Sequence, residues 1–469
     1  MLWPRWIWLR ALGLIFLSAF YSLAFQITGL IGPRGVLPAG SWLTGFSARA
    51  LWESPTIFWI SASDHALLAV VALGALASML LVLNVLPRLS LAVAWICFLS
   101  FVAAAQVFAS YQSDGMLLEA GFISLFLAPG GLRPGLAADA PPSRFSIFML
   151  KWEWFRIYFE SGVVKLLSGD VQWRTLTAMD HYYENGPLPS YLGWYMQQEL
   201  PHWFHAGSVI VVFVLELALP FLAFLPRRFR RFCFYCVTPF QALIILTANY
   251  AFLNYIVLFL GIFLLDDAVF RREPAAPGRA SLFQRAVLGV LLFVGISAAP
   301  RVRQLLPGAL LLPAQALEPF RIANRYGLFA VMTENRFEIE FQGSNDGMTY
   351  VAYPFRYKPQ ELRAAPGLFA PYQPRFEWNL WFASLSDVAA DPWVINAAVR
   401  LLQGSPPVLR LFREDPFRGK PPRYLRTVLW QYWFTSPAER RRTGAWWKRE
   451  RRGNYGPELE LVSGEVRAR

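Results

Sequence analysis

Long apolar runs confined to the first 300 residues constrain this 469-residue chain more than any other feature. A helix needs about 20 mostly apolar residues to cross the hydrocarbon core of a bilayer, which is about 30 Å thick. The runs that meet or approach this length are 6–25, 65–86, 90–110, 115–130, 146–167, 207–225, 231–249, 250–268 and 282–299. We therefore predict a polytopic α-helical membrane bundle of about nine spans over residues 1–300.

The positions of the basic residues predict an orientation for this bundle. Lys and Arg gather in the short cytoplasmic loops of membrane proteins. With Arg5 and Arg10 in the cytoplasm, nine crossings place the following arginines on the same side: Arg88, Arg133, Arg144, Arg227, Arg228, Arg230, Arg231, Arg271 and Arg272. The loops 26–64 and 168–206 and the C-terminal domain then lie on the opposite side. The same bias accounts for the net charge of +13, so no nucleic-acid partner is expected.

After residue 300 the pattern changes to that of a globular domain. Apolar and polar residues alternate over 337–342, which is typical of a half-buried strand. The pair Asp346-Gly347 separates this run from a second one at 349–353 and predicts a hairpin. A helix is expected over 378–403 and another strand over 424–434. We predict an extramembrane α+β domain over 301–469 with an antiparallel β-sandwich-like core.

Cysteines and glycosylation sequences bear on the compartment. The three cysteines, Cys97, Cys233 and Cys236, all lie in apolar stretches, and the chain has no Asn-x-Ser/Thr sequon. Both features suit a bacterial inner membrane better than a secretory pathway. Cys233 and Cys236 match Cys-x-x-Cys, but their place in an apolar helix favours a structural role over redox chemistry.

Ionisable residues inside the apolar runs are candidates for function, because their burial in hydrocarbon is costly. In the fifth run Glu153, Arg156 and Glu160 fall within about 60° of one another on a helix, so Arg156 can reach both carboxylates. Further charges in or near the runs are Asp114, Glu119, Lys165 and Glu216. Two interpretations stay open: the charges pair to lock the bundle together, or they line a site.

The aromatic loop 168–206 holds three of the four histidines. His202 and His205 have the spacing of a two-histidine metal fragment if that segment is helical, with His181 or Glu184 as a further ligand. The spacing differs from the His-Glu-x-x-His zinc motif, and interfacial histidines are the alternative interpretation. The chain has no Gly-x-Ser-x-Gly elbow, no P-loop and no dinucleotide fingerprint, so we expect neither a lipase of the usual hydrolase type nor a cofactor.

Several irregular strings resemble the lipase maturation factor family. They run in order along the chain as Tyr111-Gln-Ser-Asp-Gly-Met-Leu-Leu-Glu-Ala-Gly-Phe122, Phe159-Glu-Ser-Gly-Val-Val-Lys-Leu-Leu-Ser-Gly-Asp170, Pro201-His-Trp-Phe-His205, Asn324-Arg-Tyr-Gly-Leu-Phe329 and Glu340-Phe-Gln-Gly-Ser-Asn-Asp-Gly347. The chain departs from the family at 181–187, where it has His-Tyr-Tyr-Glu-Asn-Gly-Pro instead of Tyr-His-Tyr-Glu-Thr-Gln-Pro.

The resemblance implies a membrane-embedded maturation factor. Animal members reside in the endoplasmic reticulum and help dimeric lipases reach their active, assembled state, and lipase contact is placed in the C-terminal domain. It therefore implies two partners, the lipid bilayer and a client protein that binds within 301–469. It supplies no catalytic residue.

Two other functions compete with this one. The family also resembles, more distantly, the vitamin K-dependent carboxylase group of membrane proteins. A membrane enzyme of that kind would use a cavity lined by Glu119, Glu160, Lys165, His181 and Glu184 for acid–base chemistry on a lipid or a lipid-bound substrate. A transporter is disfavoured because the sequence has no inverted repeat.

Overall fold

Helix α1 (Leu2–Ile31) is the central element of the N-terminal bundle in the computed structural model, which describes residues 1–271, 273 and 276–469. It packs along α4 (Asp64–Val82), and α4 packs in turn against α5 (Pro87–Ala104). Glycines allow the close approach of α1 and α4. A Cβ atom at Gly13 would lie 2.8 Å from Val82, and one at Gly74 would lie 2.2 Å from Phe20. Small residues at helix contacts are typical of membrane bundles.

Further helices complete the bundle. They are α6 (Gln112–Leu125), α7 (Arg144–Leu167), α11 (His202–Phe213), α12 (Arg227–Thr247), α13 (Leu253–Leu260) and α14 (Leu282–Ser297). Of these, α6 and α13 contact α1. Helix α11 continues through a π-helical turn, η3 (Val214–Ala218), into a 3₁₀ turn, η4 (Leu219–Phe224). The loop 168–206 contains α8 (Val171–Arg174), α9 (Tyr182–Asn185) and α10 (Tyr191–Glu199).

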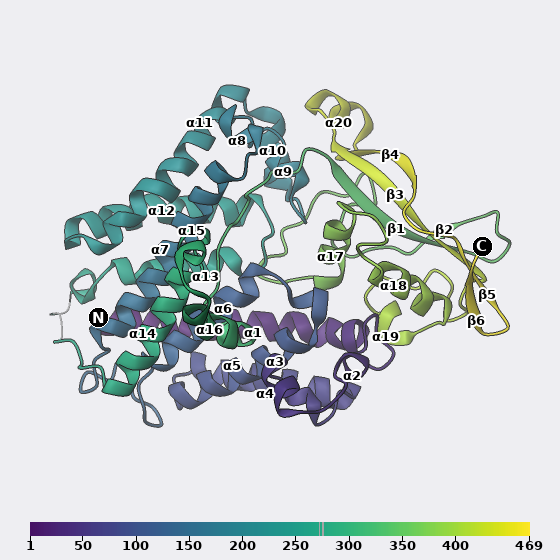
Figure 1. Cartoon of the computed structure of the whole chain (residues 1–469). Coiled ribbons are helices and arrows are strands. Elements are labelled where there is room, and N and C mark those ends of the chain that lie inside the picture. Colours follow the sequence, from purple (N-terminus) through teal and green to yellow (C-terminus); the bar gives the residue numbers. More distant parts are fainter. Residues whose placement is uncertain (272, 274–275) are drawn as a thin grey trace.

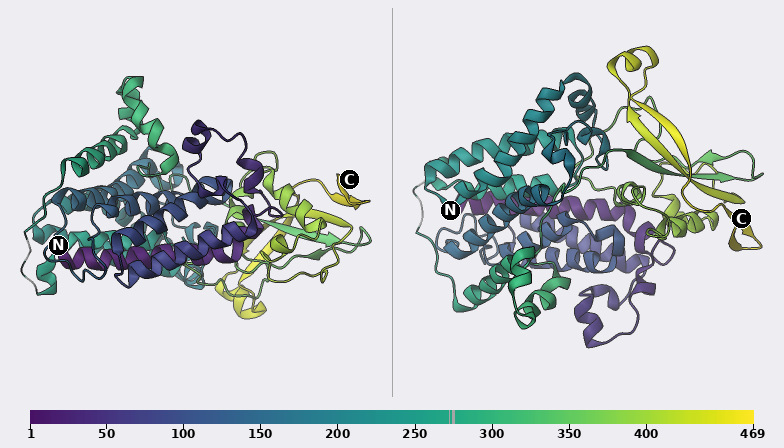
Figure 2. Two further views of the ribbon diagram at one scale, coloured as in Figure 1. Left: turned by 90° about the horizontal axis from the view of Figure 1, so that it is seen from below. Right: turned by 45° about the horizontal axis from the view of Figure 1, so that its top comes forward.

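Short helices cover the outside of the bundle. Helices α2 (Ala39–Trp42) and α3 (Ala48–Glu53) follow α1. Helices α15 (Pro300–Leu305) and α16 (Gly308–Leu317) stand off the side of the bundle, in green in Figure 2. Helix α16 reaches α3 through a hydrogen bond of 2.8 Å from the Trp52 indole to the Ala316 carbonyl.

The prediction of nine spans is not confirmed. Among the described residues, five helices are long and apolar enough to cross a membrane: α1, α4, α5, the His202–Phe224 rod and α12. A helix forms at each of the other predicted runs, but α6 has 14 residues and α14 has 16, fewer than the roughly 20 that a span needs. Helix α7 is long enough, but it carries six charged side chains.

The two ends of the bundle differ in what they contact. Three contacts lie at the end of the bundle where the chain begins. The N-terminal amine pairs with Asp267 at 2.7 Å, and Arg227 pairs with Asp266 at 2.9 Å. Arg5 donates to the Ala140 carbonyl at 2.7 Å. At the far end of α1, Ser405 donates to the Arg34 carbonyl at 2.6 Å, so that end contacts the C-terminal domain. Figure 1 shows the N-terminus and the sheet at opposite sides of the molecule. Arg272, one of the arginines predicted to be cytoplasmic, lies outside the described residues.

The C-terminal region contains one antiparallel sheet of six strands. These are β1 (Arg336–Ser344), β2 (Val351–Ala352), β3 (Tyr424–Phe434), β4 (Trp447–Asn454), β5 (Leu459–Val462) and β6 (Glu465–Ala468). The order is β2-β1-β3-β5-β6, and β4 also pairs with β3. The predicted strand at 424–434 is confirmed. The predicted hairpin is confirmed too, because β1 pairs with β2 and Gly347 adopts a φ of +71°, which favours glycine.

The predicted β-sandwich-like core is wrong, because helices rather than a second sheet pack on this one. Helix α17 (Arg375–Ala383) contacts β1, and α18 (Trp393–Leu402) contacts β3 and β5. The predicted helix at 378–403 is therefore two helices with an irregular stretch between them. Helices α19 (Pro406–Leu409) and α20 (Pro437–Thr443) complete the domain.

Strand β1 is buried on both faces instead of one. Glu338, expected to face solvent, is buried beside Arg336 and pairs with Lys358 at 2.8 Å. Arg336 also donates to the carbonyl oxygens of Glu184 (2.9 Å) and Pro187 (3.1 Å). The loop 168–206 therefore covers the polar face of β1, and no local pattern in β1 itself encodes that contact.

Candidate functional site: buried ion pairs and a cavity in the bundle

Arg156 of α7 is the centre of the first charge cluster. Its Nη1 donates to Oε1 of Glu119 on α6 at 2.9 Å, and its Nε donates to Oε1 of Glu160 at 3.1 Å. It also donates to the carbonyl oxygen of Asn324 and lies over the ring of Tyr326. The guanidinium is thus held by two carboxylates, a carbonyl and an aromatic face, which is the kind of pairing that makes a buried charge tolerable.

The carboxylates of this cluster also bind backbone. Residues 324–332 form an irregular segment, hereafter the 324–332 segment, that belongs to neither a helix nor a strand. The Asn324 N–H donates to Oε2 of Glu119 and the Tyr326 N–H donates to Oε2 of Glu160, each at 2.8 Å. Buried backbone groups outside regular structure need such partners. These buried charges therefore hold the chain that leads into the C-terminal domain.

Side chains of the same segment complete the cluster. The Asn324 amide donates to the Gly115 carbonyl at 2.9 Å, and the Tyr326 hydroxyl donates to Oε2 of Glu119 at 2.8 Å. A Cβ atom at Gly115 would lie 2.6 Å from Oδ1 of Asn324, so the approach of the segment to α6 requires glycine there.

Lys165 and Glu216 form the second cluster. Nζ of Lys165 donates to both carboxylate oxygens of Glu216 at 2.8 and 2.9 Å, and to the carbonyl of Leu328 at 3.0 Å. Glu216 lies in the π-helical turn η3, and such turns are frequent at functional sites. A Cβ atom at Gly162 of α7 would lie 2.9 Å from Cβ of Glu216, which shows how closely the two elements approach.

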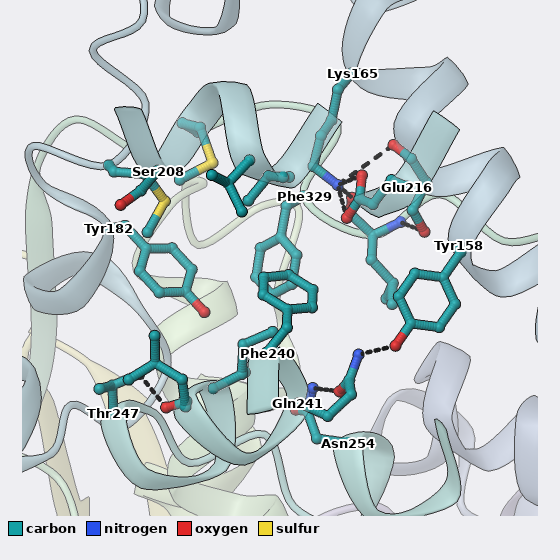
Figure 3. A pocket seen from close by; sticks show the side chains of 18 of the residues that line it. Tyr158, Lys165, Tyr182, Ser208, Glu216, Phe240, Gln241, Thr247, Asn254 and Phe329 are labelled. Carbon is teal, nitrogen blue, oxygen red and sulfur yellow. Dashed lines mark hydrogen bonds and ion pairs between the residues drawn. The ribbon is translucent and has the colours of Figure 1, made fainter. Parts of the chain in front are cut away.

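A cavity of about 450 Å³ lies beside this second cluster. Helices α7, α11, α12 and α13 and the 324–332 segment surround it, together with the loop 168–206. Lys165 and Glu216 form part of one wall, and Tyr158, Gln241 and Asn254 form a hydrogen-bonded chain on another, with two bonds of 2.8 Å (Figure 3). The rest of the lining is almost entirely apolar.

The chain resembles known proteins along most of its length. Residues 3–272 match the model of the lipase maturation factor transmembrane domain, and residues 322–457 match that of the lipase maturation factor C-terminal domain. The chain belongs to the lipase maturation factor family. It is 32% identical to lipase maturation factor 2 of Gallus gallus, a match that covers 98% of the chain and 81% of that relative. No solved structure matches the chain.

Two further relatives have similar coverage. Lipase maturation factor 2 of Homo sapiens is 32% identical over 98% of the chain and 83% of its own length. Lipase maturation factor 1 of Bos taurus is 31% identical over 97% of the chain and 88% of its own length. The family models and these relatives establish the resemblance seen in the sequence, and with it an integral-membrane maturation factor.

In this lipase maturation factor family member, the five residues proposed as catalytic for a membrane enzyme do not share one cavity. Glu119 and Glu160 both hold Arg156, and Lys165 pairs with Glu216 beside the cavity. Glu184 is buried where the loop 168–206 meets β3, and His181 is exposed.

Glu184 joins that loop to the C-terminal sheet. Its Oε2 accepts from the backbone N–H of Phe434 at 2.6 Å and from the Gln197 amide at 3.3 Å. Burial raises the pKa of the Glu184 carboxyl to about 7, against an ordinary value of 4.5. The hydrogen bonds to Phe434 and Gln197 favour the charged form but do not offset that burial.

The predicted metal fragment is not assembled. Nδ1 of His202 contacts Oδ1 of Asp180 at 3.0 Å. His205 is buried against aromatic rings, and neither of its ring nitrogens has a partner within the described part of the chain. Across residues 1–271, 273 and 276–469, no three His, Cys, Asp or Glu side chains come together as ligands. The cysteines Cys97, Cys233 and Cys236 are free.

Glu153 does not form the ion pair with Arg156 that helical spacing allows, and Asp114 has its partner in the C-terminal domain. Glu153 is fully buried and, in the part of the chain that the structure describes, its carboxyl oxygens have no hydrogen-bond partner. Arg156 instead forms an ion pair with Glu119 on the neighbouring helix. Asp114 pairs with Arg375 of α17, outside the bundle.

The polar residues of the 324–332 segment carry no pattern in the sequence that predicts their role. Asn324 and Tyr326 complete the Arg156 cluster although they lie more than 160 residues away from Arg156 in sequence. The signal that marked them was the string Asn324-Arg-Tyr-Gly-Leu-Phe329, which resembles the family but suggested no role.

Proposed function

We propose that this chain helps a translocated client protein fold or assemble, that the client is a lipase or a related exported protein, and that residues 301–469 make the contact. The names of the relatives support a lipase client. The observation that carries the proposal is the use of the buried charges of α6 and α7. Glu119, Arg156 and Glu160 are engaged by the backbone of the 324–332 segment, so they position the C-terminal domain and are not free for chemistry.

The orientation forms part of the proposal. The N-terminus and the basic loops lie in the cytoplasm, and the C-terminal domain lies across the membrane, where an exported client is found. Contacts at opposite ends of α1 and the positive-inside bias support this arrangement. A bacterial inner membrane suits the lack of sequons. In a eukaryotic cell the equivalent membrane is that of the endoplasmic reticulum.

The competing enzyme hypothesis needs Glu119, Glu160, Lys165, His181 and Glu184 around one substrate. Of these residues, Lys165 lines the cavity, and its ammonium already donates to Glu216 and to a backbone carbonyl. General acid–base catalysis requires a group within hydrogen-bond reach of the substrate. The arrangement therefore favours a maturation factor over an enzyme with this catalytic set.

Site-specific photo-crosslinking in cells tests the client contact. A photoreactive amino acid replaces Met348, which is 87% exposed in the turn between β1 and β2, and the crosslinked proteins are identified by mass spectrometry. The control position is Leu132, 64% exposed in the loop between α6 and α7 at the other end of the bundle. We expect exported proteins, lipases among them, to crosslink at 348 and not at 132.

A knockout strain provides the second part of the test. The activity of the crosslinked proteins should fall in the knockout and return when the wild-type chain is restored. The proposal is wrong if position 348 captures no exported protein, or if the captured proteins keep full activity in the knockout.

A further inference from the structure

The cavity beside Lys165 and Glu216 is partly open, and exposed side chains of α11 and α12 line it. Its rim includes Trp203 and Val211 of α11 and Leu243 of α12, which are 74%, 53% and 44% exposed. Helices α11 and α12 belong to the segments that are long and apolar enough to span a membrane. Exposed apolar side chains on such helices face lipid, so the opening between them faces the interior of the bilayer.

The side chains that line the cavity are mostly apolar, and most of their polar groups already form hydrogen bonds. The Lys165 ammonium donates to Glu216, to the Ser161 carbonyl and to the Leu328 carbonyl. The charges of Lys165 and Glu216 cancel, and the remaining lining residues carry no charge at neutral pH. The Gln241 amide donates to Tyr158 and accepts from Asn254, so these groups are also occupied (Figure 3). The cavity therefore has few unoccupied hydrogen-bonding groups for a polar or charged ligand.

We propose that the cavity holds one acyl chain of a bilayer glycerolipid, which enters between α11 and α12. Its volume of about 450 Å³ lies within the range of small-molecule sites, about 300–1,000 Å³. Apolar cavities of this kind exclude water and accept apolar guests. The aromatic residues Trp203 and Tyr183 lie on the side formed by the loop 168–206, and Trp and Tyr are enriched at the membrane–water boundary. The head end of the lipid therefore lies on that side.

The lipid chain would complete the structure around the Lys165–Glu216 pair. The pair lines the cavity, and Phe329 of the 324–332 segment lines the same space. An alkyl chain against these residues excludes water from the pair and packs against the segment that leads to the C-terminal domain. This inference does not depend on the identity of the client.

Photolabelling with a lipid tests the proposal. The full chain is reconstituted in nanodiscs of phosphatidylcholine in which one acyl chain carries a diazirine, irradiated and mapped by mass spectrometry. We expect labelling of Phe329, which lines the cavity, to exceed severalfold the labelling of Phe293, an exposed residue of α14 that lies outside it. Labelling of Phe329 that does not exceed that of Phe293 would overturn the proposal.

Two glycines provide a matched pair of variants. Gly207 of α11 lines the cavity, Gly289 lies in α14 away from it, and a Cβ atom at either would meet no atom within 4 Å. Gly207→Phe should fill the space and reduce labelling of Phe329 severalfold, whereas Gly289→Phe should leave it unchanged. If the phenylalanine variant fails to fold, Gly207→Leu replaces it. Undiminished labelling in a folded Gly207 variant also contradicts the proposal.

Discussion

Arg375 of α17 and Asp114 of α6 form a doubly hydrogen-bonded ion pair, with N···O distances of 2.7 and 2.8 Å, between the C-terminal domain and the bundle. Both side chains are buried, and Nη1 of Arg375 also donates to the Phe108 carbonyl at 2.7 Å. The fork of Arg375 fits the carboxylate and fixes the relative orientation of the two helices. A buried pair of this kind is costly to break, because the remaining charge is left without a partner.

Removal of the carboxylate charge at 114 should therefore destabilise the protein. We expect Asp114→Asn to lower the free energy of unfolding by about 3–5 kcal/mol, the usual cost of breaking a buried ion pair. Thermal unfolding of the purified protein in detergent measures the effect. The control is Arg423→Met, which breaks a solvent-exposed pair with Glu460 and should change the melting temperature little. Equal effects of the two variants would contradict a structural role for Asp114.

The Lys165–Glu216 pair should show the coupling expected of a buried structural pair. Lys165→Met and Glu216→Gln each leave one uncompensated buried group, so each should lower the melting temperature. The double variant removes both charges and should be more stable than the sum of the two single losses predicts. A double-mutant cycle on thermal stability gives the coupling energy. Full additivity would show that the pair makes no net contribution.

Glu119 and Glu153 should respond differently to the same isosteric change. Glu119→Gln removes the ion pair with Arg156 and weakens the hydrogen bond that residue 119 accepts from the Asn324 backbone N–H. The abundance of the protein in the membrane should therefore fall. Glu153 makes no hydrogen bond to the described residues, so Glu153→Gln should be well tolerated. Quantitative immunoblotting of membranes compares the two variants, and a greater loss for Glu153→Gln would contradict the assignment.

Glu184 should make stability depend on pH. Burial raises the pKa of its carboxyl from 4.5 to about 7 in the folded chain. The folded state thus binds this proton more tightly than the unfolded state does, and stability falls as the pH rises from about 4.5 to about 7. The free energy of unfolding falls by at most about 3 kcal/mol over this range. Melting temperatures between pH 5 and pH 8 should fall more steeply for the wild type than for Glu184→Gln, and parallel curves would refute this expectation.

Cysteine labelling tests the proposed orientation. Cys97, Cys233 and Cys236 are replaced by alanine, and single cysteines are then placed at Met348 and Leu132, which are both exposed. The cells are treated so that the outer membrane is permeable while the inner membrane stays intact. A membrane-impermeant maleimide should then label position 348 and not position 132. Labelling at 132 alone would show the reverse orientation.

The sequence by itself determined the local structure and the class of protein. Apolar runs placed helices at each predicted position, and the Asp346-Gly347 turn placed the β1–β2 hairpin, because both depend on residues close together in the chain. The strings from Tyr111 to Gly347 identified the family, which the matches to known proteins established. The helical spacing of Arg156 and Glu160 also gave the observed ion pair.

Only the tertiary structure decided how the charges are used. Glu153 lies within reach of Arg156 by helical spacing, yet Arg156 pairs across to Glu119 on α6. Glu338 alternates as a solvent-facing residue, yet the loop 168–206 buries it. These outcomes depend on segments distant in sequence, whose approach is set by packing and by the need of each buried charge and backbone group for a partner. A local pattern shows which residues share a face of a helix or strand, and the fold determines what that face meets.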